Sequence, residues 1–496
     1  MSNPKRLHPI AAVESFIKRL KEMVLPFVFL FFINGDKNSI WEYVPILIMG
    51  VILVIFLVMG ILGWVRFTYR LEEGELRIEN GIFVKKKRYI PFERIQSLNF
   101  SEGILQRPFG LVKVKVETAG SSGTEAEAEL SAIPKVEAER LQQTIREAKT
   151  KNKQMVFSEG EALPIGEEDV NEVVHQMTSR DLLLMALTSG GAGVLISGIA
   201  VVLSQFTEYI PYQAIFAQVE GIIRNGVLFV VVLIFLVLLV AWLLSILGVF
   251  LVYGKFKVEK SADEIIITRG IIEKKRLSIP LNRIQGIRVS ENPLRQWFGF
   301  AAVHLDSAGG SVFDKESLNI KLFPFIKKNK IGSLLQVLLP EYNVAVSFQR
   351  APKKSIRRYM MRESWMFVIP TLLLSIIFFP LGTLSLLVFV FSAFWGYLKY
   401  RSAGWNIIGN QLSLQYRVVS KHTMLVLKKR IQSFERKQSW LQKRKELNSF
   451  SVVTTSGAGP KVGTVYYMNE QDGEKVRVWY SPEERVMNSD SKSVYS

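Results

Sequence analysis

The feature that most constrains this fold is a segment that the sequence contains more than once. Aligned without a gap, residues 81–120 match residues 270–309 at an opening glycine, at a central proline and at the tripeptide Arg-Ile-Gln. A weaker third copy, around residues 430–457, keeps the tripeptide. Internal repetition of this kind predicts one structural module used three times. The repeated core positions are Pro91, Arg94, Ile95, Gln96, Pro280, Arg283, Ile284, Gln285, Arg430, Ile431 and Gln432.

Each copy follows a strongly apolar segment that ends in aromatic and basic residues. These endings are Trp64-Val65-Arg66-Phe67, Tyr253-Gly254-Lys255-Phe256 and Tyr397-Leu398-Lys399-Tyr400-Arg401. Aromatic residues are enriched where membrane helices meet water, and lysine and arginine mark their cytoplasmic ends. We therefore expect a repeating unit that consists of a membrane hairpin followed by a soluble module.

Composition limits the chemistry that the chain can perform. With 496 residues it is too long for one hydrophobic core, and it contains no cysteine, which excludes disulfides, a thiolate nucleophile and cysteine metal ligands. Its four histidines lie far apart in sequence, so we expect no metal site, and we expect no cofactor. The formal charge of +19 suggests an anionic partner. Basic flanks of membrane helices account for most of this charge, so we do not expect nucleic acid.

We expect six α-helical spans in three transmembrane hairpins. The apolar run 23–33 is short for a span of about 20 residues unless Phe16 and Ile17 belong to it. Residues 44–65, 182–206 and 227–253 are each long enough. Residues 365–397 fit either a hairpin broken at Pro380-Leu381-Gly382-Thr383 or one long tilted helix. Basic residues on both flanks favour the hairpin, because they favour the cytoplasmic side.

Small residues recur inside the third expected span. Ser189, Gly193 and Ser197 follow at four-residue spacing, which lets helices approach closely. The proposed outer loops carry only Lys37 and Arg224 as positive residues. By the positive-inside rule, both termini and all three modules are expected in the cytoplasm.

Each module is expected to be a strand meander closed by one helix. In the first copy, residues 75–78 and 112–117 alternate apolar and polar side chains, and Asn80-Gly81 is a hairpin-turn signal. Residues 134–145 have helical spacing after a leading proline. The expected order is an N-terminal hairpin 1–67, module one 68–150, an acidic linker 151–181, a second hairpin 182–254, module two 255–341, a basic linker 342–364, a third hairpin 365–401, module three 402–480 and a polar tail 481–496.

The repeated segment resembles the bacterial pleckstrin-homology-like (PH-like) domain. The resemblance rests on strands leading to I-P-x-x-R-I-Q, on a later turn at Leu105-Gln106-Arg107 with Gly110, and on the final T-A-G. Three such modules after an Arg6-Leu7-His8-Pro9 motif are similar to the YdbT-like multi-span family. The resemblance implies a seven-stranded, two-sheet barrel capped by a C-terminal helix, in a bacterial membrane.

The third copy departs from this pattern. Leu427 stands in place of the repeated proline, and Lys445-Glu446 replaces the Phe-Gly pair. We therefore expect module three to be degenerate, and the capping helix is least expected there.

Two basic runs are candidates for an anionic-lipid or partner surface. They are Lys85, Lys86, Lys87 and Arg88 in the first copy and Lys274, Lys275 and Arg276 in the second. Each basic residue near an anionic membrane contributes about 1 kcal/mol, so the runs could dock their modules to lipid. The alternative is a solvated edge strand whose lysines prevent aggregation. The repeated Arg-Ile-Gln is interpreted as structural, with the isoleucine inward and its neighbours bonded to loop carbonyls.

Few signals in the sequence support catalysis or transport. The spans lack a central ionisable residue, the usual mark of a coupled transporter. Glu93 aligns with Asn282 and Lys429, so the repeats share no catalytic acid. We expect a non-enzymatic scaffold that presents three PH-like modules at the inner leaflet for anionic lipid, for protein partners, or for both, in envelope maintenance or resistance to membrane-active agents. A shorter one-module protein of the same family is the expected partner. The alternative is a lipid or small-molecule transporter with the modules as regulatory domains, and an enzyme acting on membrane lipids ranks third.

Overall fold

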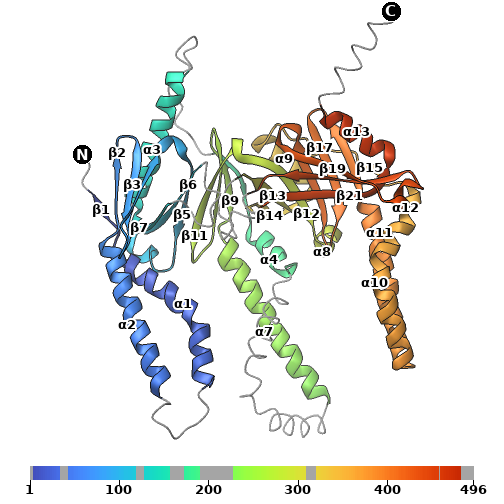
Figure 1. The fold of residues 1–496 in the computed structure, drawn as a ribbon, viewed down its shortest axis with the longest axis horizontal. Helices are drawn as coiled ribbons and strands as arrows, with labels where there is room; N and C mark the ends of the chain where they lie inside the picture. Colours follow the sequence, from blue (N-terminus) through green and yellow to red (C-terminus); the bar gives the residue numbers. More distant parts are fainter. Residues whose placement is uncertain are drawn as a thin grey trace, which may run out of the picture. The chain divides into compact units, whose positions relative to one another are not determined.

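The structure is a computed structural model that describes residues 4–33, 43–118, 128–156, 172–189, 227–308, 320–456 and 459–481 (Figure 1). The chain divides into two compact units. The first unit comprises residues 1–171 and 266–280, and the second comprises residues 172–265 and 281–496. Each unit is described by itself.

The first unit contains two N-terminal helices, of which the second is a candidate membrane span, and the first module. Its elements are β1 (Lys5–Arg6), α1 (Ile10–Ile33), α2 (Tyr43–Val65), β2 (Thr68–Glu72), β3 (Glu75–Asn80), β4 (Lys86–Pro91), the 3-10 turn η2 (Phe92–Arg94), β5 (Ile95–Glu102), the 3-10 turn η3 (Arg107–Phe109), β6 (Leu111–Thr118), β7 (Ala128–Pro134), α3 (Lys135–Val156) and, from the second repeat, β11 (Lys274–Pro280). Strands β1-β2-β3-β4 form one antiparallel sheet, and β7-β6-β5-β11 are neighbours in another. Strands β1 to β7 together give this module the seven strands that the family resemblance implies.

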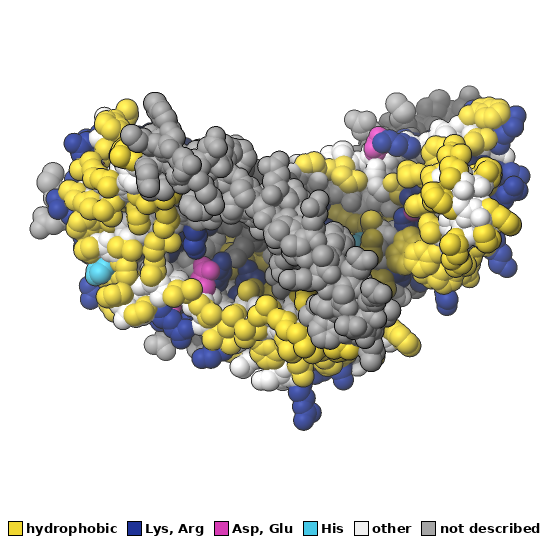
Figure 2. Space-filling model, turned by 90° about the horizontal axis from the view of Figure 1, so that it is seen from below, with side chains coloured by type: hydrophobic (Ala, Val, Ile, Leu, Met, Phe, Trp, Pro, Cys, Tyr) yellow, Lys and Arg dark blue, Asp and Glu magenta, His cyan; other side chains and the backbone are white. Residues whose placement is uncertain are grey.

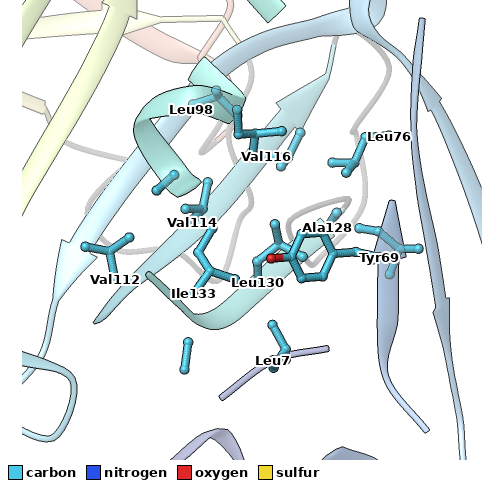
Figure 3. Close-up of a cluster of buried hydrophobic side chains, with 14 of the residues drawn as sticks. Leu7, Tyr69, Leu76, Leu98, Val112, Val114, Val116, Ala128, Leu130 and Ile133 are labelled. Carbon is cyan, nitrogen blue, oxygen red and sulfur yellow. The ribbon is translucent and has the colours of Figure 1, made fainter. Parts of the chain in front are cut away.

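The core of this module lies between its two sheets and helix α3. Figure 3 shows Leu76 from β3 together with Val114, Leu130 and Ile133 from β6 and β7, and all four side chains are fully buried. Alternation in β6 places every second residue of Val112–Val116 inward, as its period-two pattern predicts. One face of α3 closes the core with Ala138, Leu141 and Ile145.

The second unit contains the other two repeats. Its elements are β8 (Glu172–Gln176), α4 (Ser179–Leu187), α7 (Val227–Tyr253), β9 (Lys257–Lys260), the 3-10 turn η4 (Leu281–Arg283), β12 (Ile284–Glu291), α8 (Pro293–Trp297), β13 (Phe300–Ser307), β14 (Ile320–Lys327), α9 (Lys328–Leu338), β15 (Gln349–Arg350), the 3-10 turn η5 (Lys353–Ser355), α10 (Ile356–Ile377), η6 (Leu381–Ser385), α11 (Leu386–Ser402), β16 (Gly404–Ile408), β17 (Gln411–Arg417), β18 (Lys421–Leu427), the 3-10 turn η7 (Lys428–Arg430), β19 (Ile431–Lys437), α12 (Trp440–Lys443), β20 (Leu447–Thr454), β21 (Lys461–Asn469) and α13 (Glu470–Tyr480). Strand β10 (Glu264–Arg269) crosses the division between the units. One sheet has the order β14-β13-β12-β18-β17-β16-β15, and β19-β20-β21 form a three-stranded sheet.

The described parts of both expected linkers contain secondary structure. Strand β8 lies in the expected acidic linker and pairs antiparallel with β9, while β15 lies in the expected basic linker and pairs with β16. Strand β1 occupies the same place before the first helix pair and pairs with β2. Each repeat therefore begins with a short strand upstream of its membrane helices. These strands are too short to show a periodic pattern in the sequence. They acquire their partners only in the folded sheet.

The third module has a capping helix, which the sequence left open for this copy. Helix α13 follows β21 directly and buries Val476 completely in a core with Trp405, Phe450 and Val465. Gly473 in this helix lies against Asn448, where a β-carbon would come within 2.1 Å of the amide nitrogen. The sequence of α13 is polar overall, and only one face of the helix, with Asp472, Gly473 and Val476, is buried.

The repeated Arg-Ile-Gln has one local structure in all three copies. The arginine ends a 3-10 turn, in η2, η4 and η7. The following Ile95, Ile284 and Ile431 begin a strand and are 1%, 2% and 9% exposed, which fits the inward packing predicted for them. In each copy the strand register then shifts across the glutamine, so the glutamine is the extra residue of a β-bulge.

The opening glycine of the repeat is required by backbone geometry. Gly81 has φ 118° and Gly270 has φ 101°, a region that side chains disfavour. A β-carbon on either residue would come within about 2 Å of a carbonyl oxygen, on Val84 or Glu273 respectively. The glycine therefore allows the tight turn that connects β3 to β4 and its counterpart in module two.

Four described helices are long and apolar enough to cross a membrane. They span Leu47–Val65, Phe235–Tyr253, Lys353–Ile377 and Leu381–Ser402. Their side chains are largely exposed, for example Leu47 at 67%, Phe235 at 63% and Ile369 at 69%, as expected for surfaces that contact lipid. Figure 2 shows hydrophobic side chains gathered in separate areas, with lysine and arginine at their margins.

Residues 365–401 form a helical hairpin, as favoured over a single tilted helix. Helix α10 ends at Ile377, η6 makes the turn, and α11 packs back against α10. Gly396 allows this packing, because a β-carbon there would come within 2.6 Å of the Tyr359 carbonyl oxygen. Helix α10 begins at Ile356, so part of the expected basic linker is helical.

Candidate functional site

The first basic run lies at the end and along the edge of a sheet. Lys85 precedes β4 and contacts Glu79 at 2.6 Å, while Lys86, Lys87 and Arg88 belong to β4. Successive side chains of a strand point to opposite faces, so the four cations do not form one flat surface. Lys85 and Lys87 are 62% and 52% exposed and share Glu79 as a partner.

The second basic run has a different environment, although its sequence is similar. Lys274, Lys275 and Arg276 begin β11, which pairs antiparallel with β5 of module one. Lys275 also lies 3.4 Å from Glu273. This run is therefore part of a strand-to-strand junction, which counts against a lipid surface made equally by both runs.

The turn between β3 and β4 is an apolar tip beside the end of α2. Phe83 is 89% exposed and Val84 is 69% exposed, and three lysines follow them directly. The guanidinium of Arg66, at the end of α2, donates a hydrogen bond to the Ile82 carbonyl oxygen. Because α2 is a candidate membrane helix, this contact holds exposed apolar side chains next to the expected lipid surface.

Module three repeats this arrangement. The turn between β17 and β18 exposes Val418 by 58% and Val419 by 62%. The indole nitrogen of Trp395, in the candidate membrane helix α11, donates to the Val418 carbonyl oxygen at 3.2 Å. The corresponding turn of module two exposes Ile271 and Ile272 by 40% and 39%, and there Arg107 of module one donates to the Ile271 carbonyl oxygen.

In each module, a second apolar tip follows the strand that corresponds to β5. In module two it contains Trp297, 84% exposed, and Phe298, 65% exposed, at the end of α8. In module three it contains Trp440, 65% exposed, and Leu441, whose carbonyl oxygen accepts a hydrogen bond from Arg358 of α10. In module three the second tip therefore also contacts a candidate membrane helix.

Side chains of the equivalent turn join the first two modules to their upstream helices. Gln106 donates to the Glu14 carboxylate of α1 at 2.7 Å. At the aligned position of module two, Arg295 donates to the Thr188 hydroxyl just after α4 at 3.2 Å. In modules one and two, these bonds join the turn to an upstream helix or to the residue that follows it.

A cavity of about 540 Å³ lies beside the first tip. Its lining residues are Pro4, Val65, Arg66, Thr68, Tyr69, Arg70, Arg77, Glu79, Gly81 and Lys85. The ammonium of Lys85 lowers the pKa of Glu79 by a direct hydrogen bond, so Glu79 stays ionised at neutral pH. Four basic side chains line the cavity, of which Arg70 and Arg77 pair with Glu72, Glu73 and Glu75, and Lys85 pairs with Glu79. An anionic head group would bind there in competition with these carboxylates.

The remaining predicted residues do not form a site. Arg94 is exposed at the end of η2, whereas Arg283 is 9% exposed and its carbonyl oxygen accepts a bond from Gln285 at 3.1 Å. Ser189 follows α4, which ends at Leu187. Gly193, Ser197 and the other residues of 190–206 in the expected third span lie outside the described residues. The described ranges contain no group of three or more His, Asp or Glu side chains arranged for a metal ion.

The apolar tips are functional candidates that the sequence reasoning missed. A usable signal was present, because Trp297-Phe298 places two large aromatic residues together in a turn. Apolar residues also follow the opening glycine in two copies, as Ile82-Phe83-Val84 and Ile271-Ile272. Attention to the neighbouring lysines left these apolar residues unexamined.

Comparison with known proteins agrees with this architecture. The family described as Bacterial PH domain matches residues 24–149, 195–340 and 367–484. The UPF0699 transmembrane protein YdbT of Bacillus subtilis (strain 168) is 39% identical over 497 residues, which cover 97% of this chain and 99% of that protein. The UPF0699 transmembrane protein YdbS of the same organism is 28% identical over 115 residues, which cover 23% of this chain and 65% of YdbS. The chain therefore belongs to the bacterial PH domain family and, within it, to the UPF0699 transmembrane proteins.

Proposed function

We propose that this protein is a non-enzymatic membrane scaffold that holds three PH-like modules against the inner leaflet of a bacterial cytoplasmic membrane. In this proposal the chain has six spans, and both termini and all modules are cytoplasmic. The modules contact anionic lipid and recruit protein partners, in envelope maintenance or resistance to membrane-active agents. A shorter one-module protein of the same family is the proposed partner class.

The apolar tips beside the membrane helices carry this proposal. Phe83 and Val84 in module one, and Val418 and Val419 in module three, are exposed at turns that bond directly to a candidate membrane helix. Exposed apolar side chains next to cations suit the interface between acyl chains and phosphate groups. In module one, the basic cavity beside the tip supplies the matching site for an anionic head group.

Hydrogen exchange of the full-length protein tests the lipid contact. The protein is placed in nanodiscs of zwitterionic lipid, with and without anionic lipid, and exchange of the amides at residues 82–86 is measured by mass spectrometry. We expect slower exchange in anionic nanodiscs, and we expect the double variant Lys85→Gln/Lys87→Gln to lose most of the difference. The control is Lys437→Gln/Lys475→Gln, which removes the same charge from exposed positions of module three.

Equal exchange in both lipids, together with no effect of the lysine variants, would remove lipid docking from the proposal. The scaffold role has a separate test. Turnover of a membrane lipid by purified protein would contradict a non-enzymatic function.

A further inference from the structure

Module two joins module one through a strand pair with a defined register. Strand β11 runs antiparallel to β5, with Lys274 opposite Glu102 and Lys275 opposite Ser101. The backbone nitrogen of Ser278, further along β11, donates to the Asn99 side-chain oxygen at 3.2 Å. The fourth strand of module two, β11, thus extends the sheet of module one.

Module three joins module two in the same register. Strand β18 runs antiparallel to β12, with Lys421 opposite Glu291 and His422 opposite Ser290. The ungapped repeat alignment superimposes Glu102 on Glu291 and Ser101 on Ser290, and it places Lys421 at the position of Lys274. Two junctions built from different sequences therefore share a lysine opposite a glutamate and the same strand offset.

Module one has the same edge, and in the described part of the chain no strand of another module pairs with it. Strand β4 ends its sheet, and among the described residues its only paired strand is β3. Lys85 stands at the aligned position of Lys274 and Lys421. Further along the strand, Tyr89 is 54% exposed, whereas the aligned Ser278 and Leu425 are 7% and 1% exposed. Strand β4 therefore resembles the two junction strands in sequence, but its edge is more exposed than theirs.

A second copy of this chain is a poor occupant for β4. The other open edge of this type is β19, and the alignment places Gln438 where modules one and two have their glutamate. In the shared register, Lys437 and Arg436 would lie opposite Lys86 and Lys87. Like charges directly opposite each other destabilise strand pairing. Charge complementarity therefore favours a different polypeptide.

We propose that β4 is a docking edge for one strand of a PH-like module on a separate polypeptide. The docking strand is the one that corresponds to β5 and β12 of this chain. The docking strand ends in an acidic residue, whose carboxylate lies opposite Lys85. The residue that precedes this acidic residue lies opposite Lys86. Backbone hydrogen bonds supply affinity, as in other cases of strand addition to an open sheet, and the lysines admit only strands with matching acidic residues. This inference rests on the proposed scaffold function and specifies how a protein partner binds.

Disulfide trapping in the full-length protein tests the register. The chain has no cysteine, so Lys86→Cys introduces a unique thiol. The probe is a synthetic peptide with the sequence of residues 284–292, which is β12 and one further residue, carrying Ser290→Cys. Matched peptides carry either Arg288→Cys, which is off register, or Ser290→Cys with Glu291→Lys. The full-length double variant Ser101→Cys/Lys275→Cys shows whether this pair position supports a disulfide.

We expect the in-register peptide to form the mixed disulfide up to about fivefold faster than the Glu291→Lys peptide, the factor that an opposed charge pair across two strands can supply. Equal rates for all three peptides would overturn the proposal. So would the absence of trapping while the 101–275 disulfide forms. Rapid cross-linking of the Lys86→Cys protein with a Lys437→Cys copy would overturn it in favour of self-association.

This result is separable from the lipid test. The nanodisc exchange experiment contains no peptide, and the trapping experiment is carried out in detergent without anionic lipid. Loss of strand trapping with retained lipid protection at residues 82–86 would reject only the docking edge. The reverse result would reject only the lipid contact.

Discussion

The Lys421 ammonium lies 3.4 Å from the Glu291 carboxylate, and both side chains are almost excluded from water, at 12% and 4% exposure. Lys328 approaches the other carboxylate oxygen at 3.5 Å. Glu291 ends β12 and Lys421 begins β18, so this ion pair lies within the junction between modules two and three. Burial lowers the pKa of Lys421, and the attraction of Glu291 opposes that effect.

Replacing Glu291 should weaken this junction more than its surface exposure suggests. Glu291→Gln leaves Lys421 partly buried without its carboxylate, and loss of a charged partner costs about 1.5–3 kcal/mol. We expect faster amide exchange in β18 and a lower melting temperature in detergent. Glu435→Gln is the matched control, because its pair with Lys437 is exposed at 53% and 72% and such pairs contribute at most about 1 kcal/mol. Equal effects of the two variants would show that the buried pair has no special role.

The same junction should weaken in acid because of His422. Burial, and then the charges of Arg288 and Arg417, lower the pKa of His422 below its ordinary 6.5. Above that value the ring is neutral in both states; as the pH falls through it, the unfolded state takes up a proton that the folded state resists, so stability is lost. We expect β18 amides, corrected for intrinsic rates, to lose protection between about pH 7.5 and pH 5.5.

A His422→Gln variant separates this effect from general acid sensitivity. Glutamine does not titrate in this range, so protection of β18 should change less with pH in the variant than in the parent protein. Exchange in β20 and β21 of the same samples provides an internal reference. An identical pH response of β18 in both proteins would assign the loss to other groups.

Helix packing in the third hairpin should depend on Gly396. A β-carbon there would meet the Tyr359 carbonyl oxygen at 2.6 Å and the Met360 α-carbon at 2.7 Å, and both atoms belong to the backbone. Gly396→Ala must therefore separate α10 from α11, with an expected loss of about 1–3 kcal/mol. Gly248→Ala in α7 is the control, because nothing lies within 4 Å of its β-carbon position. Thermal unfolding in detergent measures both, and equal melting temperatures would contradict the close packing.

Repetition and periodicity predicted most of the architecture, because they are local properties of the chain. The modules, the hairpin at Pro380 and the inward isoleucines all follow from spacing or composition. The strands β1, β8 and β15 could not be found in this way, since two to five residues carry no periodic signal and their partners are distant in sequence. The third capping helix was the least expected of the three because the sequence of α13 is polar overall.

The sequence predicted only part of the candidate site, for a related reason. Lysine runs are conspicuous in a sequence, but Lys85 and Lys274 have similar neighbours and different environments. Lys274 lies in a strand that pairs with a strand of another repeat, whereas Lys85 does not. Residue type alone does not predict this difference in pairing. The exposure of Phe83 and Trp297 is likewise a property of the folded turn, because apolar residues are interpreted by default as core.

The depth of the first tip can be measured directly. Strand β3 runs between the turn at Glu73 and the tip at Phe83, and a strand of this length spans about 20 Å. Strand β2 begins directly after the candidate membrane helix α2, so the tip lies near the membrane and Glu73 lies away from it. The single variants Phe83→Cys and Glu73→Cys are each labelled with an environment-sensitive fluorophore in nanodiscs. We expect blue-shifted emission and quenching by spin-labelled lipid at position 83, and neither at position 73, because only the tip reaches the acyl boundary. Equal spectra at the two positions would place the tip in water and remove the lipid contact on which the membrane orientation of this module depends.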